Sequence, residues 1–144
     1  MVRKAILADA ATIANLAIKM WTSTTVDVLT EEFLDSLVGL DSATYLYIIN
    51  NTPIGFAQCQ LRRDYVEGTE TSPVGYLEGV YVEPGYRKLG YGKALIKACE
   101  DWAREKGCSE FASDCELHNT DSYAFHLRSG FTEANRIICF TKKL

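Results

Sequence analysis

Residues 87–92 read R-x-x-G-x-G, and they follow a strand-like run at residues 76–82 and precede a helix-like segment. Such a loop suits phosphate, because the first backbone N–H groups of a helix have no intrahelical acceptor and carry partial positive charge. Gly90 and Gly92 lack a Cβ, so a pyrophosphate can approach their backbone closely. Neither G-x-x-x-x-G-K-[ST] nor a G-x-G-x-x-G loop is present, so an ordinary glycine-containing turn stays the alternative.

Two carboxylates occupy positions where chemistry can be expected. Period-two alternation puts Glu78 on one strand face with Tyr76, Val80 and Val82, and puts Leu77 and Tyr81 on the other. A carboxylate on this apolar face needs either a salt-bridge partner or a function. Asp114 ends the next predicted strand, 108–114, where ligands gather at carboxyl ends, although it could instead cap the following turn.

The remaining elements alternate along the chain. Apolar periodicity and turn residues predict strands at residues 2–7, 44–49, 54–62 and 135–141. Helical spacing predicts a helix over residues 10–20 capped by Asp9, a second beginning near Thr30, a third ending at Lys106-Gly107, and a fourth over 120–129. Trp21 ends the first helix beside a polar loop, where it is either core or the wall of a sugar site.

Composition sets the broad class. The 144 residues predict one domain, 1–144, and no apolar run approaches a membrane span. No signal peptide is apparent, which favours the cytoplasm. The net charge of −4 argues against a general nucleic-acid binder and suits a cationic substrate, although it could serve solubility alone. The five cysteines form no C-x-x-C pair and indicate free thiols, and no zinc spacing predicts a metal.

The loop resembles the acyl-coenzyme A loop of the GNAT superfamily of N-acetyltransferases. Asn119, Ser122, Phe125 and Gly130-Phe131 resemble the second signature of that family, a helix that ends in Gly-Phe. The resemblance implies an α/β (α+β) fold: a mixed, mostly antiparallel twisted sheet of six to seven strands, flanked by about four helices, with a splayed central strand. It also implies acetyl-CoA bound by Val80, Tyr81, Val82, Arg87, Lys88, Leu89, Gly90, Tyr91, Gly92, Lys93 and Asn119.

Further motifs at residues 62–68, 72–74, 77–79, 106–108 and 112–114 resemble the short single-domain branch of the aminoglycoside 6'-N-acetyltransferases. That resemblance implies transfer of an acetyl group to the 6'-amine by direct attack in a ternary complex, within a homodimer. The substrate contacts that it implies are Trp21, Tyr65, Glu78, Asp114 and Glu133, with Glu78 or Asp114 taking the proton of the amine. A solvated acidic loop around Tyr65 and a charged strand end at Glu133 stay the alternatives.

One position departs from the family pattern. Many members carry a tyrosine four residues before the Gly of Gly-Phe as general acid, and His126 stands there in this chain. Tyr123, one helical turn earlier, and solvent are the other candidates. Two rival functions also stay open: acetylation of another cationic amine, such as a polyamine, a peptide or a protein lysine, and coenzyme A binding without catalysis.

Overall fold

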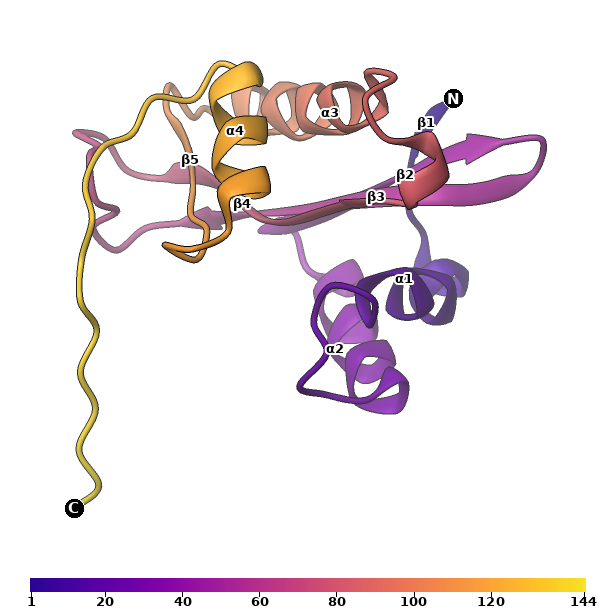
Figure 1. The fold of residues 1–144 in the computed structure, drawn as a ribbon, viewed down its shortest axis with the longest axis horizontal. Coiled ribbons are helices and arrows are strands. Elements are labelled where there is room, and N and C mark those ends of the chain that lie inside the picture. The colour runs from indigo at the N-terminus through magenta and orange to yellow at the C-terminus, as the bar shows by residue number, and fades with distance from the viewer.

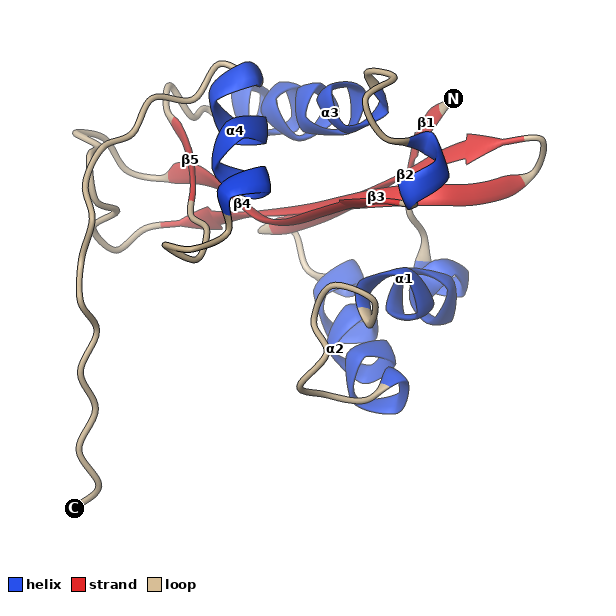
Figure 2. Cartoon of the chain, in the orientation of Figure 1, coloured by secondary structure: helices blue, strands red, loops and turns tan.

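The structure, a computed structural model, describes residues 1–144 as a five-stranded sheet with helices on both faces (Figures 1 and 2). The strands are β1 (Val2–Lys4), β2 (Ser42–Ile49), β3 (Thr52–Arg62), β4 (Val74–Val82) and β5 (Phe111–Ser113), in that spatial order. Pairing is antiparallel from β1 to β4, while β5 runs parallel to β4. The helices are α1 (Ala10–Ala17), α2 (Val26–Val38), α3 (Tyr91–Glu105) and α4 (Thr120–Arg128), with 3-10 turns η1 (Leu7–Asp9) and η2 (Pro84–Tyr86).

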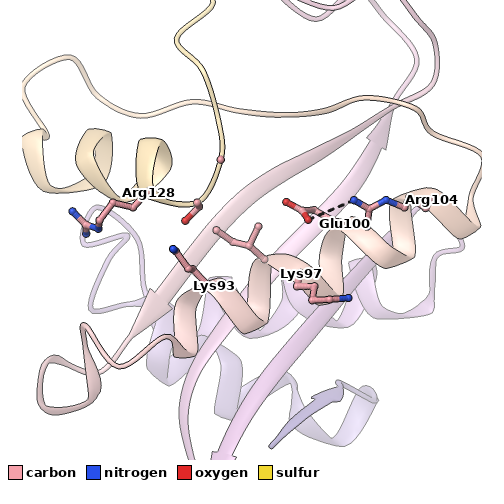
Figure 3. Close-up of a pocket in the computed structure, with 8 residues that line it drawn as sticks. Lys93, Lys97, Glu100, Arg104 and Arg128 are labelled. Carbon is pink, nitrogen blue, oxygen red and sulfur yellow. Dashed lines mark ion pairs between the residues drawn. The ribbon is translucent and has the colours of Figure 1, made fainter.

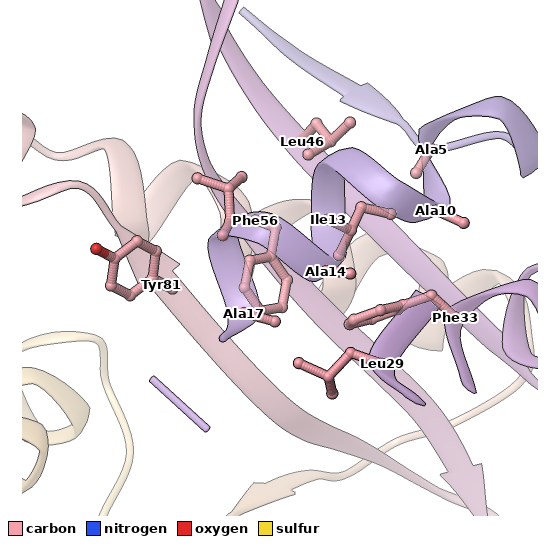
Figure 4. Close-up of a cluster of buried hydrophobic side chains, with 11 residues drawn as sticks. Ala5, Ala10, Ile13, Ala14, Ala17, Leu29, Phe33, Leu46, Phe56 and Tyr81 are labelled. Atoms are coloured by element: carbon pink, nitrogen blue, oxygen red, sulfur yellow. The ribbon is translucent and has the colours of Figure 1, made fainter. Parts of the chain in front are cut away.

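Two apolar layers hold the sheet between its helices. On one face, Ile13 of α1 and Phe33 of α2 pack against Phe56 and Tyr81 of the sheet (Figure 4). On the other face, the buried stripe of α3, which includes Leu95, packs against the sheet. Removing these side chains from water is the main favourable contribution to folding, at roughly 25 cal/mol for each Å² of apolar surface buried.

A β-bulge at Glu78 interrupts the alternation of β4. Gln58 pairs with Gly79 and Cys59 pairs with Leu77, so Glu78 is the additional residue on β4. The predicted sharing of one face by Glu78, Val80 and Val82 is therefore wrong. Beyond the bulge, Val80 and Val82 pack toward α3 with Leu77, whereas Tyr81 packs toward α1 and α2.

The strands β4 and β5 separate after a short contact. Their pairing covers only Gly75–Leu77 against Phe111–Ser113. From Glu78 onward β4 continues to Val82 with β3 on one side and no strand on the other. The expected splay of the central strand is present, and it leaves the backbone of Val80 to Val82 available on the side that β5 vacates.

The final strand predicted at residues 135–141 does not form, and the sheet has five strands rather than six to seven. Residues 132–144 instead run as an extended segment away from the body of the molecule (Figure 1). A strand needs a neighbour to satisfy its backbone N–H and C=O groups, and no strand of the same chain lies beside this segment. We call residues 132–144 the C-terminal arm.

The start of one helix and the capping of another differ from the expected ones. Helix α2 begins at Val26, because the Thr25 hydroxyl accepts a 3.2 Å hydrogen bond from the Val28 N–H and so caps it. The helix therefore starts before Thr30. Helix α1 begins at Ala10 as expected, but the Asp9 side chain does not cap it, because its carboxylate accepts hydrogen bonds from Arg3 and from the Ile6 N–H.

Three further features bear on function. No helix has both the length and the apolar character that crossing a membrane requires. No group of three or more His, Cys, Asp or Glu side chains is arranged to hold a metal ion. All five cysteines are free thiols.

Candidate active site

The loop between β4 and α3 presents a row of free backbone donors. The backbone N–H groups of residues 88–93 donate to no acceptor within the chain. Lys88 and Gly90 have positive φ angles of 62° and 88°, and this backbone conformation turns the loop into the N-terminus of α3. Arg87 anchors the loop, because its Nε donates a 2.7 Å hydrogen bond to the carbonyl of Val82. The free donors and the helix end are suited to an anion, so we call residues 88–93 the anion-binding loop.

The two glycines of this loop have different roles. A Cβ added to Gly90 would meet nothing within 4 Å, so the space above it is open to a ligand. A Cβ added to Gly92 would lie 2.9 Å from the ring of Phe125 in α4. Gly92 is therefore required by the packing of α3 against α4. The approach of a pyrophosphate to either glycine stays a prediction, and only Gly90 has open space where a Cβ would lie.

A basic groove lies between α3 and the end of α4 (Figure 3). It has a volume of about 430 Å³ and includes Lys93, Lys97, Arg104 and Arg128. Glu100 also lines the groove and pairs with Arg104 at 3.8 Å (Figure 3), and Asp101 pairs with both Lys97 and Arg104. Lys93 and Arg128 have no ion-pair partner within the chain. Because Lys93 also ends the row of free N–H groups, the positive potential of the loop extends into this groove.

A second cavity opens on the opposite face of the sheet, toward α1 and α2. Its volume is about 360 Å³. The residues that line it are Trp21, Thr24, Leu29, Glu32, Gln58, Gln60 and Glu78. We call this the acceptor cavity. It joins an indole wall to two carboxylates and two amides, a combination that suits a polar, cationic molecule with an apolar ring face.

Glu78 reaches the acceptor cavity from the bulge and is held by two neighbours on β3. Arg62 donates to both carboxylate oxygens, from Nη2 to Oε1 at 2.9 Å and to Oε2 at 3.0 Å, and from Nε to Oε1 at 3.1 Å. Gln60 Nε2 donates to Oε1 at 2.6 Å. The sequence left open whether Glu78 has a salt-bridge partner or a function. The salt bridge is present, with Arg62, and Glu78 also lines the acceptor cavity.

Asp114 lies just beyond β5 and accepts a hydrogen bond from the Tyr76 hydroxyl through Oδ2. Burial, followed by this hydrogen bond and the nearby negative charge, raises the pKa of Tyr76 far above its usual value. The phenol therefore stays a donor at all ordinary pH values. The Arg62 guanidinium lies 3.4 Å from the centroid of the Tyr76 ring, so a continuous set of contacts links Asp114 to Glu78.

Trp21 belongs to the core and also lines the acceptor cavity, while its contact with a substrate stays a prediction. Its ring stacks on Phe33 at a centroid distance of 6.4 Å and meets the edge of Phe56 at 6.1 Å, which ties it to the core. It also lines the acceptor cavity, directly above the bulge, where a Cβ on Gly79 would lie 2.6 Å from the indole. The glycine after Glu78 thus makes room for the tryptophan.

Two predicted substrate contacts lie apart from this cavity within the chain. Tyr65 is 76% exposed on the β3–β4 loop and does not line the cavity. Glu133 lies near the start of the C-terminal arm and pairs with Arg136 of the same arm. The arm passes beside the β3–β4 loop, since Asn135 donates a 2.8 Å hydrogen bond to Glu67. The roles of Tyr65 and Glu133 in binding stay predictions.

Helix α4 carries the remaining candidates. The Asn119 side chain accepts a 3.1 Å hydrogen bond from the Ser122 N–H, so Asn119 caps α4 through Oδ1 and keeps its amide donors free. His126 Nδ1 lies 2.7 Å from the Ser122 carbonyl, which can only accept, so this nitrogen carries a proton. His126 Nε2 lies 2.9 Å from Ser113 Oγ, which also lies 3.2 Å from the Leu77 carbonyl, so the one hydroxyl proton of Ser113 has two competing acceptors.

Sequence reasoning missed Arg62 as a partner of Glu78, and it missed the two glutamines. One signal could have revealed them. Gln58, Gln60 and Arg62 alternate with apolar residues along β3, so three polar side chains share one face of an otherwise buried strand. Ser113 and the bonding of Tyr76 to Asp114 left no such pattern.

These features can be compared with known proteins. The profile of the acetyltransferase (GNAT) family matches residues 10–131. This match shows that the chain belongs to the GNAT acetyltransferase family, and the splayed strand agrees with it.

Its similarity to the aminoglycoside N(6')-acetyltransferases type 1 extends along the whole chain. The enzyme of that name from Stenotrophomonas maltophilia is 40% identical over 144 residues, covering 99% of this chain and 93% of the relative. The Klebsiella aerogenes enzyme is 37% identical, covering 100% and 97%. The family resemblance inferred from the sequence is thereby confirmed.

Solved structures agree with these relatives. The apo aminoglycoside 6'-N-acetyltransferase AAC(6')-IG from Acinetobacter haemolyticus superposes with a TM-score of 0.95 at 35% identity, covering 100% of this chain and 99% of the other. AAC(6')-Iy in complex with the bisubstrate analogue CoA-S-monomethyl-acetylneamine gives a TM-score of 0.95 at 33% identity, covering 100% and 98%.

Proposed function

We propose that this chain transfers the acetyl group of acetyl-CoA to the 6'-amine of aminoglycosides by direct attack in a ternary complex. The observation that carries the proposal is the arrangement of the two sites about β4. The anion-binding loop lies at its carboxyl end, and the acceptor cavity opens beside its bulge at Glu78. The relatives named above act on aminoglycosides, and the bisubstrate complex of AAC(6')-Iy joins both substrates in one molecule.

The residues of the loop fit coenzyme A. Acetyl-CoA supplies an activated thioester when it is bound. The free N–H groups of residues 88–93 suit its pyrophosphate, and the unpaired cations Lys93 and Arg128 add positive charge beside them. The backbone of Val80 to Val82, unpaired on the side away from β3, would donate to the pantetheine arm and the thioester carbonyl.

The acidic side chains fit a cationic acceptor, and their surroundings divide their roles. Glu78 is charge-compensated by Arg62, so it suits orientation of an ammonium group more than removal of its proton. Asp114 has only the Tyr76 hydroxyl as partner, which leaves Oδ1 free and the carboxylate charge uncompensated. We therefore assign proton removal, directly or through water, to Asp114 and orientation to Glu78.

Direct attack is favoured over an acetyl-cysteine intermediate. No cysteine hydrogen-bonds to His118 or His126. His126 contacts Ser113 and Ser122 instead. Hydrogen bonding with Cys59, together with burial, holds the pKa of the Cys99 thiol well above its usual value. A protonated, buried thiol is a poor nucleophile. For the general acid, His126, Tyr123 and solvent all stay candidates.

We propose further that the chain acts as a homodimer joined through the C-terminal arm. Ile137, Ile138 and Phe140 are 70%, 80% and 88% exposed on this extended segment, although β-branched and aromatic residues favour a buried strand. The outer edge of β5 is an unpaired sheet edge that a strand from a second copy could extend. The apolar residues would then be covered by the partner.

Light scattering tests the dimer. We expect twice the chain mass of 16.1 kDa for the protein and the mass of one chain for Ile138→Lys. Lys143→Ala, at the end of the same arm, is the control and should keep the mass of the unaltered protein. A monomer in the unaltered protein at assay concentration would contradict the proposal.

Free-thiol release from acetyl-CoA tests the activity. Kanamycin and tobramycin should release thiol, whereas analogues that carry a 6'-hydroxyl should not. Turnover of spermidine or of a lysine peptide alone would point to a different amine substrate, and coenzyme binding without any turnover would indicate a binding module.

We place the reaction in the cytoplasm, because five free cysteines suit a reducing compartment.

A further inference from the structure

Arg62 contacts Glu78 directly and is linked to Asp114 through Tyr76. Its guanidinium makes a two-point contact with Glu78 and lies over the ring of Tyr76, whose hydroxyl donates to Asp114. Arg62 projects from β3 beside the acceptor cavity without lining it. It therefore holds the acids from outside the space that a substrate would occupy.

The hydrogen bonds to Glu78 are distributed unevenly over its two oxygens. Oε1 accepts from Gln60 Nε2 and from both Nε and Nη2 of Arg62, at 2.6, 3.1 and 2.9 Å. Oε2 accepts only from Arg62 Nη2, at 3.0 Å. Each carboxylate oxygen offers about two acceptor positions, so Oε1 is filled and Oε2 retains one.

The bulge makes this arrangement dependent on Arg62. Glu78 is the additional residue of β4, and the register shift removes it from the regular cross-strand pairing that would otherwise fix its direction. The planar fork of a guanidinium restricts a carboxylate to one orientation, which a single amide from Gln60 does not do. Stacking on Tyr76 in turn holds the plane of the fork.

We propose that Arg62 is a positioning residue for the acceptor amine: it orients Glu78 so that the free position on Oε2 receives an ammonium group of the substrate. Through Tyr76 it also keeps the distance between Glu78 and Asp114 fixed, so that the amine held by one acid lies within reach of the other. The inference rests on the proposed function, because it concerns the acceptor site of that reaction.

The test compares Arg62→Met with Arg63→Met. Arg63 is the next residue, and it pairs with Asp41 at 2.6 Å on the exposed surface. Arg63→Met therefore also removes one guanidinium–carboxylate pair, but away from the acceptor cavity. Calorimetry measures aminoglycoside binding to the protein saturated with coenzyme A. We expect Arg62→Met to raise the Kd roughly 10- to 100-fold, and we expect Arg63→Met to leave it unchanged.

A second comparison separates positioning from general damage. In a Glu78→Gln background, Arg62→Met should cause little further loss, because Arg62 acts through Glu78. Arg62→Lys should restore part of the affinity, since a lysine keeps the charge and loses the fork. The KM for acetyl-CoA should stay constant throughout.

Three results would overturn the inference: an equal loss from Arg62→Met with and without Glu78, a parallel rise in the KM for acetyl-CoA, or full activity in Arg62→Met. If Arg62→Met does not fold, Arg62→Lys decides: a Kd for the aminoglycoside equal to that of the unaltered protein overturns the inference, and a raised Kd supports it. Binding tests Arg62, whereas thiol release tests the reaction, so aminoglycoside binding without turnover would contradict the proposed function alone.

Discussion

Replacement of Gly90 by alanine strains the anion-binding loop by an amount that follows from its backbone angles. Gly90 has φ 88° and ψ 0°, a left-handed conformation that costs an L-residue with a Cβ roughly 1–2 kcal/mol. No protein atom lies within 4 Å of the added Cβ, so this backbone strain is the whole cost within the chain. At about 1.4 kcal/mol for each tenfold change, the competent loop becomes roughly 5- to 30-fold less populated.

We therefore expect Gly90→Ala to raise the KM for acetyl-CoA by roughly 5- to 30-fold if the loop relaxes out of this conformation. If the conformation is retained, the strain appears as a Tm lowered by about 2–8 °C. Steady-state kinetics and scanning calorimetry of the same sample distinguish the two. The KM for the aminoglycoside should not change, because the acceptor cavity lies on the other face of the sheet.

Gly85 provides the matched control. It lies in the same β4–α3 connection, a Cβ there also meets nothing within 4 Å, and its φ is not positive. Gly85→Ala should therefore leave both the KM for acetyl-CoA and the Tm near those of the unaltered protein. Equal effects of the two substitutions, or no effect of Gly90→Ala on either quantity, would refute the assignment of strain to Gly90.

Other substitutions probe the packing and the charges. Gly92→Ala should lower the Tm by a few degrees, because overpacking against Phe125 outweighs the gain in helix propensity, and calorimetry on Phe125→Leu/Gly92→Ala should show partial recovery. Trp21→Leu should raise the KM for the aminoglycoside several-fold while the KM for acetyl-CoA stays constant in thiol-release kinetics. Hydrogen bonds from Arg3 lower the pKa of Asp9, so the stability from this pair is present above about pH 4 and is lost as the pH falls through the lowered pKa. As the pH falls below about 4, the Tm of Asp9→Asn should therefore fall less steeply than that of the unaltered protein. Equal slopes for the two proteins would contradict a stabilising role of the Arg3–Asp9 pair.

Short-range patterns in the sequence predicted the elements whose formation depends on neighbouring residues along the chain. The strand, loop and helix around residues 76–106 form as expected, because their apolar periodicity and glycines act over short distances. Asn119 caps α4 as its residue type predicts. The start of α2 was misplaced because both Thr25 and Thr30 are good cap residues, and only the observed hydrogen bond distinguishes them.

The features that sequence could not predict depend on register between strands. Alternation along β4 was read without the bulge, which arises from the pairing of Gln58 and Cys59 with β4 and leaves no mark in β4 alone. The pairing of Arg62 with Glu78 follows from that register. The strand at residues 135–141 failed for a different reason, because strand propensity has no effect without a neighbour to pair with.

The bulge at Glu78 also divides the side chains of β4 into two sets on opposite sides of the strand. On one side of β4, Leu77, Val80 and Val82 pack beneath α3, next to the proposed coenzyme site. On the other side, Glu78 and Gly79 serve the acceptor cavity. Because the side chains of the two sets never share a face after the bulge, substitutions that retune the choice of amine can accumulate on one set while the other stays intact. A lineage could thus exchange acceptors repeatedly and keep a single way of using acetyl-CoA.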